Sequence, residues 1–207
     1  MPTCLQNWRK EPNMPSAMIT FTFLSPWHMG SGFGEGANLD ALPVKTAAGL
    51  PYIPGRSIKG LFREAVQLAE ECGQLPPQQT TTDLFGSNDS MLSRYETTAG
   101  RLQFSSATMG EAMEQWAAAQ NNSQAVRELY MPLASTAIDA NGLADDNTLR
   151  KIEVALPVTL TATVNTTGTE TDDLSILRTV APLIRQAGSD RHRGLGRVQV
   201  TVTEATK

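Results

Sequence analysis

Two groups of cations, each beside a glycine, are the residues in this sequence best placed to do chemistry. Arg56, Lys59 and Arg63 follow Gly55 at the start of a predicted helix. The start of a helix carries unpaired backbone N–H groups and the positive end of the helix dipole, so three added cations there would attract a phosphate group. An ordinary amphipathic helix with solvated basic residues would show the same pattern. The first group is therefore a candidate phosphate site whose alternative is a solvent-facing helix surface.

The second group lies near the end of the sequence, in the loop RHRGLGR at residues 191–197. Arg193 and Arg197 supply guanidinium groups, which pair with phosphate in a planar and often bidentate manner. Gly194 and Gly196 leave backbone N–H groups accessible to the same anion. The alternative is a glycine turn whose arginines are solvated. Together the two groups predict contacts with the backbone of an RNA.

The overall composition shows no charge signature of a nucleic-acid-binding protein. The 207 residues carry a formal net charge of -4, and the pI is about 5.2. Any RNA contact must therefore come from local clustering of cations. Two cysteines, Cys4 and Cys72, are too few for a disulfide framework, which favours a reducing compartment. Because no apolar run reaches membrane length and no leader pattern is present, we expect a cytoplasmic protein without membrane association.

The apolar periodicity predicts a single domain that positions these groups. Residues 1–16 lack periodicity and are interpreted as an N-terminal arm, and residues 17–207 as the domain. Strands with alternating apolar residues are expected at residues 17–24, 101–108, 158–164 and 197–204.

Helices and insertions separate these strands. A helix capped by Ser57 is expected to end near Cys72, and a second helix over residues 174–184 is weakened by Pro182. A connector is expected at residues 73–82, helical insertions at 110–120 and 123–130, and a longer insertion with turn residues at about 131–155. The order β-α-β-β-α-β predicts an α+β, ferredoxin-like fold, in which two helices cover one face of a four-stranded antiparallel sheet, as in RNA recognition motifs.

Three motifs in this order resemble the RAMP superfamily of CRISPR proteins, over roughly residues 18–204. They are the turn Pro54-Gly55 leading into Ser57-Ile58-Lys59-Gly60, the segment Asp83-Leu84-Phe85-Gly86 before the second strand, and the loop 191–197 before the last strand. The resemblance implies an RRM-like domain with a thumb-like β-hairpin at about 131–155. It also implies that guide RNA is held by Lys59, Arg63, Arg193 and Arg197, with Arg56, Gly194 and Gly196 as further candidates.

The resemblance further implies a backbone subunit of a type III CRISPR effector complex. Copies or paralogues of such a subunit, with other effector subunits, stack along a guide CRISPR RNA, and base pairing reads the complementary target RNA. These subunits carry a loop aspartate that supports metal-dependent cleavage of the target. Asp40 follows the glycine-rich loop after His28 at the expected place, although the length of that loop makes Glu35 the alternative. The expected activity is that of an endoribonuclease in which Asp40 binds a divalent ion, expected to be Mg²⁺.

Two other functions fit the same residues. A non-catalytic structural RAMP subunit, or an ordinary RNA-binding module, would carry Asp40 as a solvated loop residue. A RAMP relative that processes guide RNA precursors would use His28 as a general acid or base without a metal. His28 would otherwise touch RNA phosphate or pack beside Trp27. The thumb-like segment and the position of Asp40 favour the backbone subunit.

Overall fold

The computed structural model describes residues 15–36, 38–75, 79–87, 97–145, 148–167 and 172–204. Residues 1–14, which make up most of the expected N-terminal arm, lie outside the described residues, as does Asp146 of the thumb-like segment. None of the described helices is long and apolar enough to cross a membrane.

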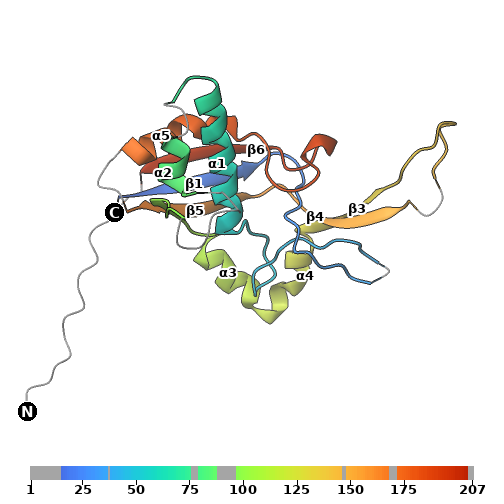
Figure 1. Cartoon of the computed structure of the whole chain (residues 1–207). Helices are drawn as coiled ribbons and strands as arrows, with labels where there is room; N and C mark the ends of the chain where they lie inside the picture. The colour runs from blue at the N-terminus through green and yellow to red at the C-terminus, as the bar shows by residue number, and fades with distance from the viewer. Residues whose placement is uncertain are drawn as a thin grey trace, which may run out of the picture.

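A four-stranded antiparallel sheet forms the centre of the described structure, with the strand order β2-β5-β1-β6 (Figure 1). The strands are β1 (Ser16–Phe23), β2 (Leu102–Phe104), β5 (Thr159–Thr166) and β6 (Val198–Glu204). In the middle of the sheet, Phe21 of β1 pairs with Leu160 of β5 and with Val200 of β6. The predicted α+β class with an antiparallel sheet is confirmed.

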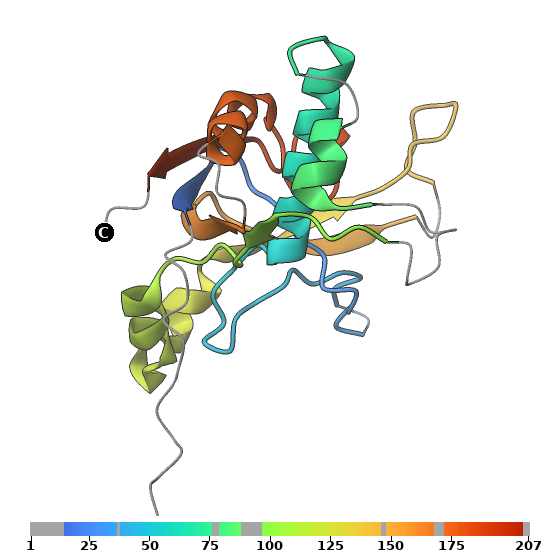
Figure 2. The same cartoon turned by 60° about the vertical axis from the view of Figure 1, so that its left-hand side comes forward.

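The sheet has one apolar face because its strands alternate. Ile19, Phe21 and Phe23 of β1 are buried, whereas Thr20 and Thr22 between them are not. Successive side chains of a strand point to opposite faces, so this alternation places every second residue in the core. The helices α1 (Gly55–Glu71), α2 (Gln79–Phe85) and α5 (Asp172–Val180) cover the apolar face (Figures 1 and 2).

Helix α1 begins two residues before the predicted cap. Pro54 stands at the N-cap, and the N–H group of Ser57 donates to the carbonyl oxygen of Pro54 over 2.8 Å, so Ser57 lies in the first turn. A Cβ on Gly55 would come within 2.4 Å of the carbonyl oxygen of Phe104. Glycine is therefore needed where α1 meets the end of β2. The backbone of Phe104 and Ser105 thus lies against the start of the helix.

Helix α2 spans the end of the predicted connector at residues 73–82 and most of the motif Asp83-Leu84-Phe85-Gly86. Thr81 donates from its backbone N–H and from its hydroxyl group to the two carboxylate oxygens of Glu70, over 2.9 and 2.6 Å. Leu84 and Phe85 at the end of the helix are buried. Tertiary contacts with α1 thus stabilise a seven-residue helix that is too short to show a clear periodicity.

The second predicted helix also differs in its last turn. Helix α5 ends at Val180 and continues as the short 3₁₀ helix η2 (Ala181–Leu183), which contains Pro182. Proline has no N–H group to donate to the α-helical ladder, so the weakening expected at this residue is confirmed as a change of helix type.

Two insertions leave the sheet in different directions (Figure 1). The first contains α3 (Glu111–Ala118), η1 (Gln120–Asn122) and α4 (Ser123–Arg127), and it encloses a small apolar cluster of Leu50, Ala117 and Val126. The second is a two-stranded hairpin of β3 (Tyr130–Ser135) and β4 (Arg150–Ala155), which projects away from the sheet. The part of the chain from residue 110 onward thus contains short helices followed by a hairpin, between β2 and β5 of the central sheet.

Candidate nucleic-acid interface

The hairpin is joined at its base to the loop that carries Asp40. Trp27 and Ala155 exchange two backbone hydrogen bonds of 2.9 and 2.8 Å, and the N–H group of Glu153 donates to Ala41 over 3.0 Å. Two hydrogen bonds of 2.7 Å join Asp40 to Lys151. The N–H group of Asp40 donates to the carbonyl oxygen of Lys151, and the N–H group of Lys151 donates to Oδ2 of Asp40. The Asp40 carboxylate is therefore exposed but held against β4.

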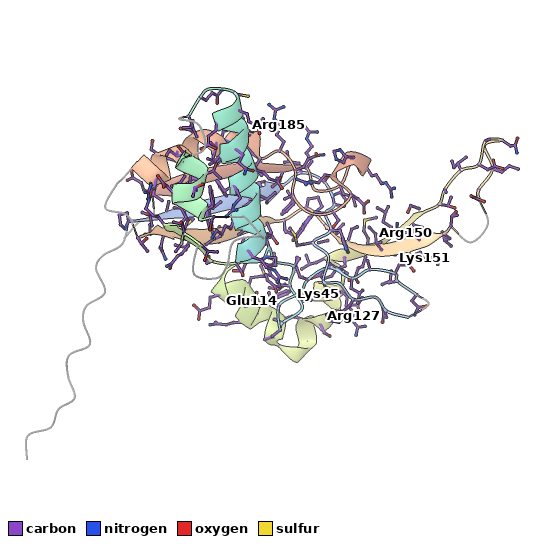
Figure 3. The ribbon with its side chains drawn as sticks, viewed as in Figure 1. Lys45, Glu114, Arg127, Arg150, Lys151 and Arg185 are labelled. Carbon is purple, nitrogen blue, oxygen red and sulfur yellow. The ribbon has the colours of Figure 1, made fainter. Side chains whose placement is uncertain are left out.

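A partly buried polar cluster braces the same junction. Lys45 Nζ lies 2.6 Å from Oε2 of Glu153 and 4.0 Å from the centre of the Tyr130 ring. The Tyr130 hydroxyl group donates to the carbonyl oxygen of Gly49 over 2.7 Å. Burial, followed by the negative charges of Glu153 and Glu114, raises the pKa of Tyr130, so its phenol stays neutral and remains a donor. Figure 3 shows Lys45 and Glu114 near the base of the hairpin.

The two predicted carboxylates lie in different parts of the loop. Glu35 is exposed in a turn closed by a 2.7 Å hydrogen bond from its own N–H to the carbonyl oxygen of Leu39. Asp40, in contrast, lies beside β4. In the described part of the chain, no three His, Cys, Asp or Glu side chains come together as a possible metal site. Asp40 is thus a single carboxylate beside the hairpin.

The structure does not support the roles predicted for His28. The residue is only 4% exposed, and its Nδ1 lies 2.7 Å from the carbonyl oxygen of Glu153. Trp27 beside it stacks on Phe23 with ring centres 4.2 Å apart. A buried imidazole that fixes β4 is not placed to touch RNA phosphate or to act as a general acid or base on RNA. The expectation that it packs beside Trp27 is closer to what is found.

The cations of α1 are less available than the sequence suggested. Arg63 donates from Nη2 to the carbonyl oxygens of Phe85 and Gly86, over 2.8 and 3.4 Å, and so fastens the end of α2. Lys59 is partly buried, and desolvation followed by the charge of Arg63 lowers its pKa. Arg56 is exposed, but the N–H group of Gly55 donates to Ser106, which covers the helix start. The start of this helix is therefore packed against Ser106, and RNA binding by these three cations stays a prediction.

The glycine-rich loop separates its two candidate arginines. Arg193 is well exposed, lies 3.6 Å from Asp190 and faces the hairpin, whereas the exposed Arg197 lines a different hollow beside β6. Gly194 and Gly196 have φ angles of 87° and 71°, which favour glycine. A Cβ on Gly196 would lie 2.0 Å from the carbonyl oxygen of Ala187. Gly196 is therefore required for packing, and Arg193 is the loop residue placed for a ligand at the hairpin.

A polar hollow of about 620 Å³ lies between this loop and the far end of the paired hairpin strands, where Ser135 pairs with Arg150. Its lining includes Ser135, Thr136 and Thr148 from the hairpin, with Arg150 at the start of β4 and Arg193 from the loop. Figure 3 shows Arg150 and Lys151 next to each other on the hairpin. Two guanidinium groups and several hydroxyl groups around one hollow suit a phosphate. The sequence placed Arg150 in the thumb-like segment but gave no sign that it would meet Arg193.

The hairpin tip is held by Asp139. Its Oδ1 accepts hydrogen bonds from the backbone N–H groups of Leu143 and Asn141, over 2.8 and 2.9 Å. The bond from Leu143 is the largest cause that lowers the pKa of Asp139, and the bonds from Asn141 add to it. Ile138 and Leu143 nevertheless remain two-thirds exposed. The tip is thus an ordered turn with apolar side chains facing outward.

Acid should loosen this tip. Because the folded pKa of Asp139 is depressed, its contribution is present above the unfolded value and is lost as the pH falls through the folded value. We expect the amide proton shifts of Asn141 and Leu143 to titrate together, with a midpoint below the ordinary aspartate value of about 3.9. Asp139→Asn should abolish this titration. A midpoint at or above the ordinary value would contradict the hydrogen-bonded turn.

Comparisons with known proteins agree with this architecture. The family model of the RAMP superfamily matches residues 20–199. No curated protein matches the chain. One chain of the cryo-EM structure of the Type III-B Cmr-beta bound to cognate target RNA superposes with a TM-score of 0.68 at 10% identity, over 92% of this chain and 98% of the other. A chain of the apo Type III-B Cmr-beta structure gives a TM-score of 0.63 at 10% identity, over 90% and 96%. At this identity the likeness shows a shared fold.

Proposed function

The chain belongs to the RAMP superfamily, and from this premise we propose that it is a guide-RNA-binding backbone subunit of a type III CRISPR effector complex. The fold shared with chains of the Type III-B Cmr-beta structures supports the proposal. So does the strand order β2-β5-β1-β6 with α1 and α5 on one face, which we assign as ferredoxin-like. We assign the β3–β4 hairpin as the thumb. The partners would be guide RNA, complementary target RNA and other subunits, including copies of this chain.

The observation that carries the RNA-binding proposal is the hollow between Arg150 and Arg193. Its two guanidinium groups come from the hairpin and from the glycine-rich loop, and so they would grip one stretch of RNA backbone from two sides. The net charge of -4 does not oppose this role, because a subunit that holds a few nucleotides needs only local positive charge.

Removing both arginines should weaken RNA binding without regard to sequence. We expect Arg150→Ala with Arg193→Ala to lower the affinity for single-stranded RNA at least about tenfold at low salt. The slope of log affinity against log salt should fall by about 1.4, because each lost phosphate contact removes about 0.7. The measurement is a salt series of RNA titrations followed by fluorescence anisotropy.

A matched control removes the same charge elsewhere. Arg127 on α4 and Arg178 on α5 are both exposed and lie outside the hollow. The variant Arg127→Ala with Arg178→Ala should keep the wild-type affinity and salt slope. Equal losses in the two double variants would mean that only net charge matters. An unchanged slope in the Arg150 and Arg193 variant would reject this hollow as the RNA site.

We further propose that Asp40 supports cleavage of the target RNA with Mg²⁺. One carboxylate oxygen of Asp40 accepts the N–H group of Lys151, and the exposed carboxylate keeps its second oxygen for a ligand. Mg²⁺ commonly binds through one or two carboxylates together with substrate phosphates and water, so a single protein carboxylate fits when RNA is present. When bound, such an ion polarises the scissile phosphate or activates water.

The single carboxylate of Asp40 also fits a structural role without cleavage. A structural subunit without nuclease activity would need no further ligands, and in the described part of the chain Asp40 has no acidic or histidine cluster around it. A substitution at Asp40 separates the two functions.

A further inference from the structure

A second hollow lies on the other side of the glycine-rich loop, between the outer face of α1 and the segment that follows α5. Its volume is about 210 Å³. Leu61, Ala65 and Leu68 line it from α1, and Leu183 and Ile184 line it from the opposite wall. None of the residues that line the hairpin hollow takes part.

The walls suit a flat apolar ring. Leu61 and Leu68 lie seven residues apart on one face of α1, and Leu68 is 46% exposed although it is a large apolar residue. Leu183 faces them from η2 across the hollow. Binding pockets for small aromatic groups are commonly apolar with a few convergent polar groups. A planar ring inserted here would cover the exposed edge of Leu68.

The polar groups at the rim combine one carboxylate with two guanidinium groups. Glu64 lies between Leu61 and Leu68 on α1, and its Oε2 lies 3.4 Å from Nη1 of Arg191. Arg185 lines the same hollow and stands beside the C-terminal part of α1 in Figure 3. The amide group of Gln186 donates to the carbonyl oxygen of Arg191 over 2.8 Å, which fixes the backbone from which that arginine extends.

We propose that this hollow binds a guanine base, taken from single-stranded RNA or from a free guanine nucleotide. Guanine presents two adjacent donors, N1–H and the 2-amino group, which match the two oxygens of the Glu64 carboxylate. On its other side O6 and N7 are acceptors, and arginine is a common partner of both. Single-stranded RNA is generally recognised in this way, with unstacked bases held flat and bonded at their edges.

The other bases match the rim less well. Adenine and cytosine place a ring acceptor beside their amino group, which would face the Glu64 carboxylate and repel it. Uracil has one ring N–H between two carbonyl oxygens, so it offers the carboxylate a single donor. The rim therefore selects guanine by charge and donor pattern rather than by size.

The Glu64–Arg191 contact does not block the hollow. It is a single contact at 3.4 Å between side chains that are 64% and 40% exposed. Exposed ion pairs of this kind contribute little to stability, so a ligand that bonds both partners can replace it. The closed form seen here would then be the unliganded state of the site.

The test compares RNA oligonucleotides that differ in one base. A uridine 12-mer with one central guanosine should bind the full chain at least tenfold more tightly than the all-uridine 12-mer, and inosine, which lacks the 2-amino group, should lose most of that gain. Glu64→Gln should abolish the preference and keep the affinity for all-uridine RNA. Glu71→Gln, which removes a carboxylate of α1 that does not line the hollow, should change nothing. Equal binding of the first two RNAs by the wild type would overturn the proposal.

This inference rests on the proposed RNA-binding function when the base belongs to RNA, and the two can fail separately. If all-uridine RNA binds with a strong salt dependence but guanosine adds nothing, the hollow is rejected and RNA binding stands. If no RNA binds, GMP and UMP are titrated directly and the methyl NMR signals of Leu61 and Leu68 are followed. Shifts with GMP alone would support the guanine site as a nucleotide site. Shifts with neither nucleotide would reject it.

Discussion

Asp40→Ala is expected to reduce cleavage of complementary target RNA at least about 100-fold in a guide-loaded complex, while target binding stays close to wild type. The loss of a direct metal ligand should exceed the 10- to 100-fold cost usually seen for groups that only support a ligand. Binding should persist because the carboxylate acts where charge develops during the reaction, whereas the phosphate contacts that we propose lie at Arg150 and Arg193. The measurement uses end-labelled RNA with Mg²⁺ or with a chelator.

The contact between Asp40 and Lys151 allows a sharper control. Asp40→Asn keeps an oxygen that can accept the N–H group of Lys151, so the loop should stay on β4 while the charge is lost. If charge is what matters, Asn and Ala should be equally inactive. If only the loop position matters, Asn should retain activity.

The remaining outcomes assign the function. Wild-type complex should give regularly spaced fragments that the chelator abolishes. Unchanged cleavage by Asp40→Ala would move the role to Glu35 or to another subunit. A wild-type complex that binds target with Mg²⁺ and never cuts would be a structural subunit.

Gly196→Ala is expected to prevent stable folding. The added Cβ would lie 2.0 Å from the carbonyl oxygen of Ala187, and the φ of 71° disfavours alanine as well. The backbone pairing at this point cannot move freely, because Ala187 donates to the carbonyl oxygen of Gly196 over 2.9 Å. We expect the free energy of unfolding to fall by more than about 4 kcal/mol. Single substitutions cause losses of this size only through severe defects such as overpacking or backbone strain. Thermal unfolding followed by circular dichroism would measure it.

Gly194→Ala is the matched comparison. Its φ is 87°, but no atom lies within 4 Å of the added Cβ. Only the backbone strain remains, which costs about 1 to 2 kcal/mol. If the two variants lose similar amounts of unfolding free energy, the positive φ accounts for the loss and the close approach to Ala187 does not.

The sequence predicted an element of the fold correctly where apolar residues recur at the spacing of a strand or a helix. The alternation of Ile19, Phe21 and Phe23 predicted β1, and the helical spacing after Ile58 predicted α1, because each pattern buries one continuous face. The helix start was placed wrongly because Gly55 is dictated by the carbonyl oxygen of Phe104, a residue far away in the chain. Local capping rules carry no information about that contact.

The candidate site was less accessible for the same reason. The sequence shows that Arg63 and Arg193 are cations. It does not show that Arg63 donates to the carbonyl oxygens of Phe85 and Gly86, or that Arg193 lines a hollow. It also cannot show that Arg150 joins Arg193, since the hairpin and the loop meet only in the folded chain. His28 could have been suspected of burial from its place beside Trp27, at the end of an alternating strand.

The backbone pairing of Trp27 with Ala155 fixes one end of the hairpin, so this point serves as a pivot if the hairpin bends. At a strand rise of about 3.3 Å per residue, Lys151 lies roughly 13 Å from this pivot and Ile138 roughly 26 Å. A rigid rotation of the hairpin would therefore displace the Asp40 carboxylate, which is tied to Lys151, only about half as far as the tip. The position of the carboxylate is therefore less sensitive to bending of the hairpin than the position of the tip.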